Sequence, residues 1–89
     1  MREKVGRSVA LRYDKTLPAP FVVARGRGRL AEELNRLARE HGVPIVEDEE
    51  LSGLLYEVEV GESIPIETFE AVARVLAFVY SVSSQKGLN

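Results

Sequence analysis

The stretch Phe21–Leu34 reads FVVARGRGRLAEEL and joins a β-strand pattern directly to a helical pattern. The apolar run at its start predicts a strand over Phe21–Arg25 that is buried on both faces. From Gly28 to His41, leucines and alanines recur at helical spacing, which predicts a helix with one apolar face. The junction between them holds two glycines and three arginines: Gly26, Gly28, Arg25, Arg27 and Arg29.

The flanking sequence extends this junction into a small α/β domain. Alternating β-formers predict a first strand over Ser8–Tyr13, which a proline-containing loop connects to the second strand. After the first helix, Val43–Glu47 (VPIVE) predicts a third short strand. Two more helices are predicted, from Asp48 to about Glu57 and from Pro65 to about Val82. The predicted order is β-β-α-β-α-α, an α/β single domain with a small mixed sheet of about three strands covered by helices.

The glycines also match the pattern of a dinucleotide-binding turn, G-x-G-x-x-A, with Glu47 lying 21 positions after Gly26. Three features favour a structural turn instead. The chain is too short for a two-halved dinucleotide sheet, Ala31 is the weaker third residue, and the acidic run 47–50 would repel a polyphosphate. A small nucleotide- or RNA-binding βαβ module that uses Gly26, Gly28 and the arginines stays open as the alternative.

Composition narrows the class of protein. The 89 residues include no cysteine, which excludes disulfides and thiolate chemistry and fits a reducing cytoplasm. No apolar run approaches the roughly 20 residues of a membrane-spanning helix, so we expect a cytoplasmic protein with no membrane insertion. The net charge of −2 is segregated, because residues 1–29 carry eight Lys/Arg against two acids and residues 30–89 carry four against twelve.

Residues that could carry chemistry are few. The single histidine, His41, has no serine on a nucleophile-elbow turn to serve, so we expect no catalysis. The run EDEE at residues 47–50 fits a helix N-terminus better than a metal site, and no metal or cofactor is expected. The Arg-Gly run lacks interleaved aromatic residues, which argues against nucleic acid. Small apolar residues in Ala19-Pro20 and the last helix could form a shallow peptide groove or ordinary core packing.

Five segments, taken together, identify a resemblance. In order, they are VALRYD, APFVVARG, HGVPIVED, LLYEVEVGESIP and FEAVARVLAFVY. They resemble the cytoplasmic C-terminal domain of the FlhB/YscU family, the switch proteins that set substrate specificity in flagellar and type III protein export. The likeness covers roughly residues 8–80. It implies a switch domain over residues 8–82, preceded by a partly disordered remnant (1–7) and followed by a flexible tail (83–89).

This sequence also differs from the family in two features. Family members have an N-terminal membrane domain and a self-cleaving Asn-Pro-Thr-His loop just before the first strand of this domain. The matching place here reads Glu3-Lys4-Val5-Gly6, without the attacking asparagine, the proline or the histidine. We therefore expect a stand-alone homologue that does not cleave itself, is free of a membrane anchor and is not an enzyme.

Partners follow from the resemblance in the same way. In the family, an apolar patch of this domain is thought to receive a short hydrophobic motif of early export substrates. By residue match, this patch is Ala19, Pro20, Ala73 and Leu76, while Arg25, Arg27 and Arg29 are candidate contacts with other export-apparatus proteins. Without the preceding strand, Ser8–Tyr13 would lie at an open sheet edge, guarded by Arg7 and Arg12. The N-terminal part of a full-length family member could pair with that edge.

Overall fold

The computed structural model of the chain describes the backbone of residues 6–87 and the side chains of residues 6–81. The elements run in the order β1 (Arg7–Arg12), β2 (Phe21–Arg27), α1 (Arg29–Glu40), α2 (Glu49–Tyr56), a short 3₁₀ helix η1 (Ile66–Thr68) and α3 (Phe69–Gly87). The prediction of a small α/β domain with three helices is confirmed. The last helix runs to Gly87, farther than predicted, and most of the predicted N-terminal remnant, residues 1–5, lies outside the described residues.

The sheet is an antiparallel hairpin of β1 and β2. Arg7 pairs with Arg27 at one end and Arg12 with Phe21 at the other, and a register shift after Ala10 leaves Val23 without a partner, as in a β-bulge. Beyond β2, Phe21 forms an isolated antiparallel bridge with Ser63. A short piece of the connection between α2 and α3 thus covers the outer edge of the hairpin.

The predicted third strand over Val43–Glu47 is wrong, and with it the mixed sheet of about three strands. Within residues 6–87 the sheet has two strands, and residues 41–50 are exposed at every position. Pro44 has no N–H to give to a sheet, and the N–H of Val43 donates to the carbonyl of Ala38 at the end of α1 (2.8 Å). The edge of β2 is already taken by the bridge to Ser63. The segment has high β propensity but pairs with neither β1 nor β2.

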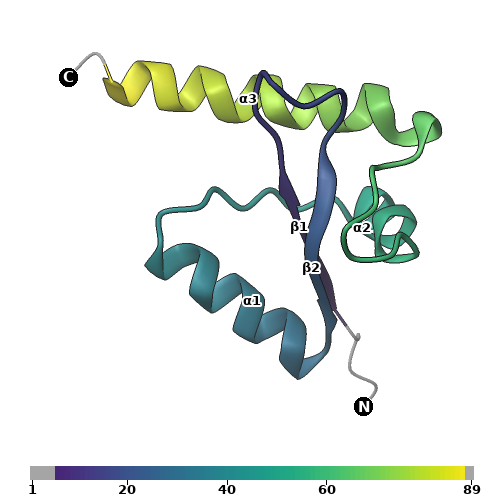
Figure 1. Cartoon of the computed structure of the whole chain (residues 1–89). Helices are drawn as coiled ribbons and strands as arrows, with labels where there is room; N and C mark the ends of the chain where they lie inside the picture. Colours follow the sequence, from purple (N-terminus) through teal and green to yellow (C-terminus); the bar gives the residue numbers. More distant parts are fainter. Residues whose placement is uncertain (1–5, 88–89) are drawn as a thin grey trace.

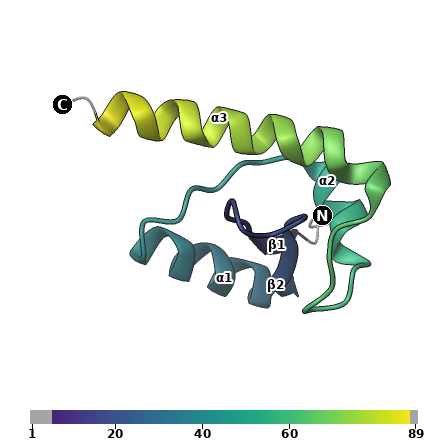
Figure 2. The same cartoon turned by 45° about the horizontal axis from the view of Figure 1, so that its top comes forward.

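The helices surround the hairpin on three sides. In Figure 1, α1 and α2 flank it on opposite sides, and α3 lies across its loop end; Figure 2 shows the same arrangement from a second direction. The buried core cluster lies on the α2 side and consists of Leu51, Leu55, Ile64 and Val72. Half-buried residues of β1 and α3 pack against this cluster: Val9, Leu11, Ala71, Val75 and Leu76.

The strand-to-helix junction needs its two glycines for different reasons. Gly28 is the residue before α1 and has φ 60°, a conformation that side chains disfavour. Gly26 has ordinary strand geometry, but a Cβ there would lie 2.9 Å from both the carbonyl carbon and the Cβ of Leu30. One glycine therefore allows the turn, and the other allows the first turn of α1 to approach the strand closely.

Candidate functional site

The loop between β1 and β2 forms the first wall of the candidate site. Asp14 braces it: its Oδ1 accepts from the N–H of Thr16 (2.8 Å) and from the Thr16 hydroxyl, and its carbonyl accepts from the N–H of Leu17 (3.1 Å). The hydrogen bond from the Thr16 side chain, followed by that from its backbone, lowers the pKa of Asp14. At the far end of the loop, the carbonyl of Pro20 accepts from the N–H of Ile64 (3.0 Å). The loop is therefore fastened at both ends.

The first half of α3 forms the second wall. Thr68, the last residue of η1, lies directly before this helix and is buried, and its hydroxyl and its N–H both donate to the carbonyl of Pro65 (2.7 and 2.9 Å). Val72, one turn later, is 2% exposed and anchors the helix in the core. Ala73, the next residue, is exposed, and Leu76 is half-buried. One face of α3 therefore packs inward while the neighbouring face lies beside the loop.

The two walls enclose a groove of about 670 Å³, and all four residues of the predicted patch line it. Pro20 is buried, Ala19 and Leu76 are half-buried, and Ala73 is exposed. The groove has the size of a typical ligand site and an almost entirely apolar lining, with Glu70 as its one charged residue. The full lining is Tyr13, Pro18, Ala19, Pro20, Ile64, Phe69, Glu70, Val72, Ala73, Leu76, Ala77 and Tyr80.

Sequence reasoning found the centre of this groove but missed its ends. Phe69, Ala77 and Tyr80 also line it, at four positions before, four after and seven after Ala73. Extending the helical spacing from Ala73 along the same face would have found all three. The same spacing could not have identified Tyr13, because this residue lies at the start of the hairpin loop and reaches the groove only in the folded structure.

The three predicted arginine contacts have different surroundings. Arg25 is turned inward: its Nη1 donates to the carbonyls of Tyr56 (2.6 Å) and Val58 (3.0 Å), and its Nη2 lies 3.8 Å from a carboxylate oxygen of Glu59. Its guanidinium also lies 5.4 Å from the ring centre of Tyr56. Arg27 and Arg29 are exposed. Arg25 therefore fastens β2 to the connection after α2, and only Arg27 and Arg29 are presented to solvent.

The Arg-Gly turn lacks the setting of a nucleotide site. The βαβ unit is not formed, and the N–H of Gly28, which could have faced a phosphate, donates to the carbonyl of Gly6 (2.8 Å). The acidic run caps α2 as predicted, since Asp48 Oδ1 accepts from the N–H of Leu51 (3.0 Å). Among residues 6–87, no three His, Cys, Asp or Glu residues are grouped as metal ligands would be. No helix in this part of the chain combines the length and apolar character needed to cross a membrane.

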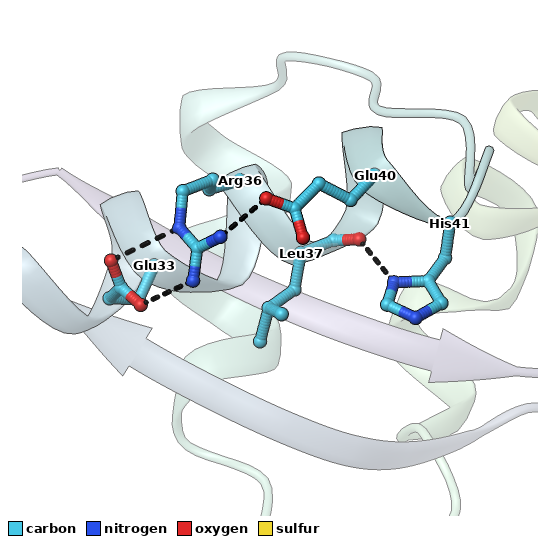
Figure 3. A network of polar contacts seen from close by, with 5 residues as sticks. All are labelled: Glu33, Arg36, Leu37, Glu40 and His41. Atoms are coloured by element: carbon cyan, nitrogen blue, oxygen red, sulfur yellow. Dashed lines mark hydrogen bonds and ion pairs between the residues drawn. The ribbon is translucent and has the colours of Figure 1, made fainter.

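A polar network lies along the outside of α1 (Figure 3). Arg36 bridges Glu33, at 3.0 and 3.3 Å, and Glu40, at 2.5 Å. The hydrogen bond to Arg36 lowers the pKa of Glu33, and the bonds to Glu33 and Glu40 raise that of Arg36. His41 Nδ1 lies 2.9 Å from the carbonyl of Leu37, so this nitrogen carries the proton when it bonds there. Each contact is local to the helix, so the network acts on the stability and charge of α1 only.

Comparison with known proteins gives one consistent result. Residues 6–79 match the model of the FlhB HrpN YscU SpaS Family. The flagellar biosynthetic protein FlhB of Bacillus subtilis is 38% identical over 80 residues, which cover 88% of this chain and 22% of that protein. The B. subtilis protein YlqH, which carries the description uncharacterized, is 37% identical over 79 residues, covering 88% of this chain and 85% of YlqH.

Solved structures agree with this result. The cytoplasmic domain of FlhB from Shewanella putrefaciens superposes with a TM-score of 0.79 at 38% identity, covering 83% of this chain and 63% of that structure. The PscU C-terminal domain gives a TM-score of 0.77 at 29% identity, covering 82% and 95%. The chain thus spans about a fifth of the FlhB proteins, but most of YlqH and of the PscU domain.

Proposed function

The chain belongs to the FlhB HrpN YscU SpaS family, and on this basis we propose that it is a non-enzymatic interaction module of the flagellar or type III protein export apparatus. Its role is to dock early export substrates in the groove between the hairpin loop and α3. It acts in the cytoplasm, beside the export gate, and contributes to the choice of substrate. Export-apparatus proteins contact it through the exposed Arg27 and Arg29.

One observation carries the docking proposal: two pairs of residues that are more than 50 positions apart in the sequence line the same apolar groove. The pairs are Ala19 with Pro20 and Ala73 with Leu76. A groove whose walls are fixed before binding loses little conformational entropy when a peptide enters. The hydrogen bonds of Asp14, Pro20 and Thr68 supply that fixation. An apolar peptide motif is the ligand that matches such a lining.

Self-cleavage is not part of the proposed function. The cleavage loop of the family needs an asparagine followed by a proline, and the 89 residues contain no Asn-Pro pair. The purified chain should therefore keep its intact mass by mass spectrometry during days at neutral pH. Appearance of two fragments whose masses sum to that of the chain, or to that mass plus one water after the terminal succinimide opens, would contradict this proposal.

A second partner is the N-terminal part of a full-length family member, which would supply a strand to the outer edge of β1. Within residues 6–87, β1 pairs on one side only. Three apolar residues that such a strand could help to cover are strongly exposed: Val43, Ile45 and Val46 are 53%, 41% and 40% exposed. Co-purification with the N-terminal fragment of a full-length homologue tests this pairing, and a clean separation of the two would remove it.

Docking itself is tested by NMR titration of the labelled chain with a peptide that carries the apolar motif of an early export substrate. We expect saturable shifts at Ala19, Ala73 and Leu76. Ala73→Asp, which places a charge in the groove at an exposed position, should abolish binding. Ser81→Asp is the matched control, because Ser81 is exposed on the same helix and does not line the groove.

The outcomes separate cleanly. Saturable shifts that Ala73→Asp removes and Ser81→Asp leaves support docking in this groove. No shifts at millimolar peptide, or shifts that survive Ala73→Asp, would overturn it. In that case the fold would serve its partners through the β1 edge or the exposed arginines instead.

A further inference from the structure

The walls of the groove offer almost no backbone hydrogen-bonding groups to a ligand. In the loop wall, Pro18 and Pro20 have no N–H, and the Pro20 carbonyl is already bonded to Ile64, so Ala19 has the one amide N–H of this stretch. In the other wall, the N–H and C=O groups of α3 are engaged within the helix. A peptide that binds by adding a strand needs a row of alternating N–H and C=O groups, and the loop wall has one N–H donor, so it offers no such row. The ligand is therefore recognised through its side chains and must satisfy its own backbone.

The shape of the α3 wall suits a helix. Phe69, Ala73 and Ala77 recur four residues apart along one ridge, so two small side chains follow a large one, and Tyr80 closes the far end. Small residues at this spacing leave a shallow channel into which the i, i+4 ridge of a second helix fits. From Phe69 to Tyr80 the wall is about 17 Å long, which corresponds to roughly three helical turns.

The charge of Glu70 favours one orientation of the ligand along the groove. Glu70 is the one charged residue of the lining and lies in the first turn of α3, at the Phe69 end of the groove. It is ion-paired with Arg74 on the same helix (2.5 Å), but both side chains are strongly exposed, so its charge still faces solvent. The lining offers no positive charge at either end. A ligand with positive charge at the Glu70 end is therefore favoured. A helix has a partial positive charge at its N-terminus, and lysines placed there would add full charges for Glu70 to attract.

We infer that the groove binds its partner as an amphipathic α-helix, with the apolar stripe against Ala73 and Ala77 and the positively charged N-terminal end beside Glu70. This inference rests on the proposed docking function and specifies the form of the ligand. It implies that the segment recognised is helical when bound, whatever its state in free solution. It also makes Glu70 a residue that selects the direction of the ligand.

Synthetic peptides test the inference. The first peptide, about 16 residues long, carries apolar residues at i, i+3, i+4 and i+7 and two lysines at its N-terminus. A second peptide has one central polar residue replaced by proline, and a third has the lysines moved to the C-terminus. We expect the proline to weaken binding by about tenfold or more, since it breaks the helix. Moving the lysines should weaken it by roughly two- to fivefold.

Two further measurements make the result specific. The ¹³Cα shifts of the bound first peptide should be helical. Glu70→Gln should weaken binding of the peptide with N-terminal lysines and leave that of the peptide with C-terminal lysines nearly unchanged, while both still bind. Equal affinity for the first two peptides, or extended shifts in the bound state, would overturn the helical ligand and leave docking intact. Failure of every apolar peptide, including the export motif, would instead overturn the docking function itself.

Discussion

The two edges of the β-hairpin differ sharply. Beyond β2, residues 61–64 are tied on by three backbone hydrogen bonds: Val22 N–H to Glu62 O (3.0 Å), Gly61 N–H to Val22 O (2.7 Å) and Ile64 N–H to Pro20 O (3.0 Å). Beyond β1, no described strand is paired, and the connection 41–50 is exposed throughout. The covered edge holds an irregular segment of weak β propensity, and the open edge leaves a segment of strong β propensity unpaired. Pairing is thus decided by which backbone lies in reach more than by propensity.

The largest contrast in stability should lie between the buried core and the exposed connection 41–50. Leu55 is 4% exposed and belongs to the buried core cluster. The substitution Leu55→Ala should lower the free energy of unfolding by about 2–5 kcal/mol. Val46→Ala, in the exposed connection, should change the unfolding free energy by less than about 0.5 kcal/mol. Urea denaturation of both variants measures the two values. Similar losses would mean that residues 41–50 are packed in solution.

The next effect concerns the side chain that holds the covered edge. Arg25→Ala leaves the carbonyls of Tyr56 and Val58 without their donor and should cost about 1–3 kcal/mol. Arg25→Lys should recover little of this, because an ammonium group cannot reproduce the planar fork of a guanidinium. Arg27→Ala is the matched control, because Arg27 is an exposed residue of the same strand. Thermal melts of the three variants decide whether Arg25 fastens the edge.

The sequence predicted most of these elements, and the four patch residues named from it lie two in each wall of the groove. Both strands, all three helices and the cap at Asp48 lie within a few residues of their predicted places, because each has its own periodicity or terminal signal. Whether Val43–Glu47 forms a strand could not be predicted from its own residues. A strand needs a neighbouring strand to pair with, and the outer edge of β2 is already occupied by Ser63. The role of Arg25 was hidden for the same reason. Its partners Tyr56 and Val58 follow it by more than 30 positions and meet it only in the tertiary fold.

A smaller effect is expected where the exposed connection enters α2. Asp48→Ala removes the acceptor for the N–H of Leu51 and should cost about 1 kcal/mol of unfolding free energy. Asp48→Asn should retain most of the stability, because an asparagine side chain caps equally well. Chemical denaturation measures both. A loss from Asp48→Asn as large as that from Asp48→Ala would show that charge, and not the cap hydrogen bond, is what matters there.

The smallest effect concerns the outside of α1. Glu33 has a lowered pKa because Arg36 hydrogen-bonds to it, so its contribution is present at neutral pH and is lost as the pH falls through that lowered pKa. Arg36→Gln should raise the pKa of Glu33 toward its ordinary value and leave the fold unchanged. An NMR pH titration of the Glu33 carboxyl carbon measures the shift. An unchanged pKa would mean that the pair is not formed in solution.

The position of the exposed connection has a practical consequence. One groove wall, the hairpin loop, precedes residues 41–50, and the other, α3, follows them. A cut within 42–47 leaves α2 and its Asp48 cap intact but assigns the two walls to separate fragments, as loop cuts at exposed sites allow. Neither fragment alone contains a groove, so recovery of peptide binding after mixing would report their reassembly. The chain could therefore serve as a fragment-complementation sensor, in which peptide binding is restored only when the two fragments associate.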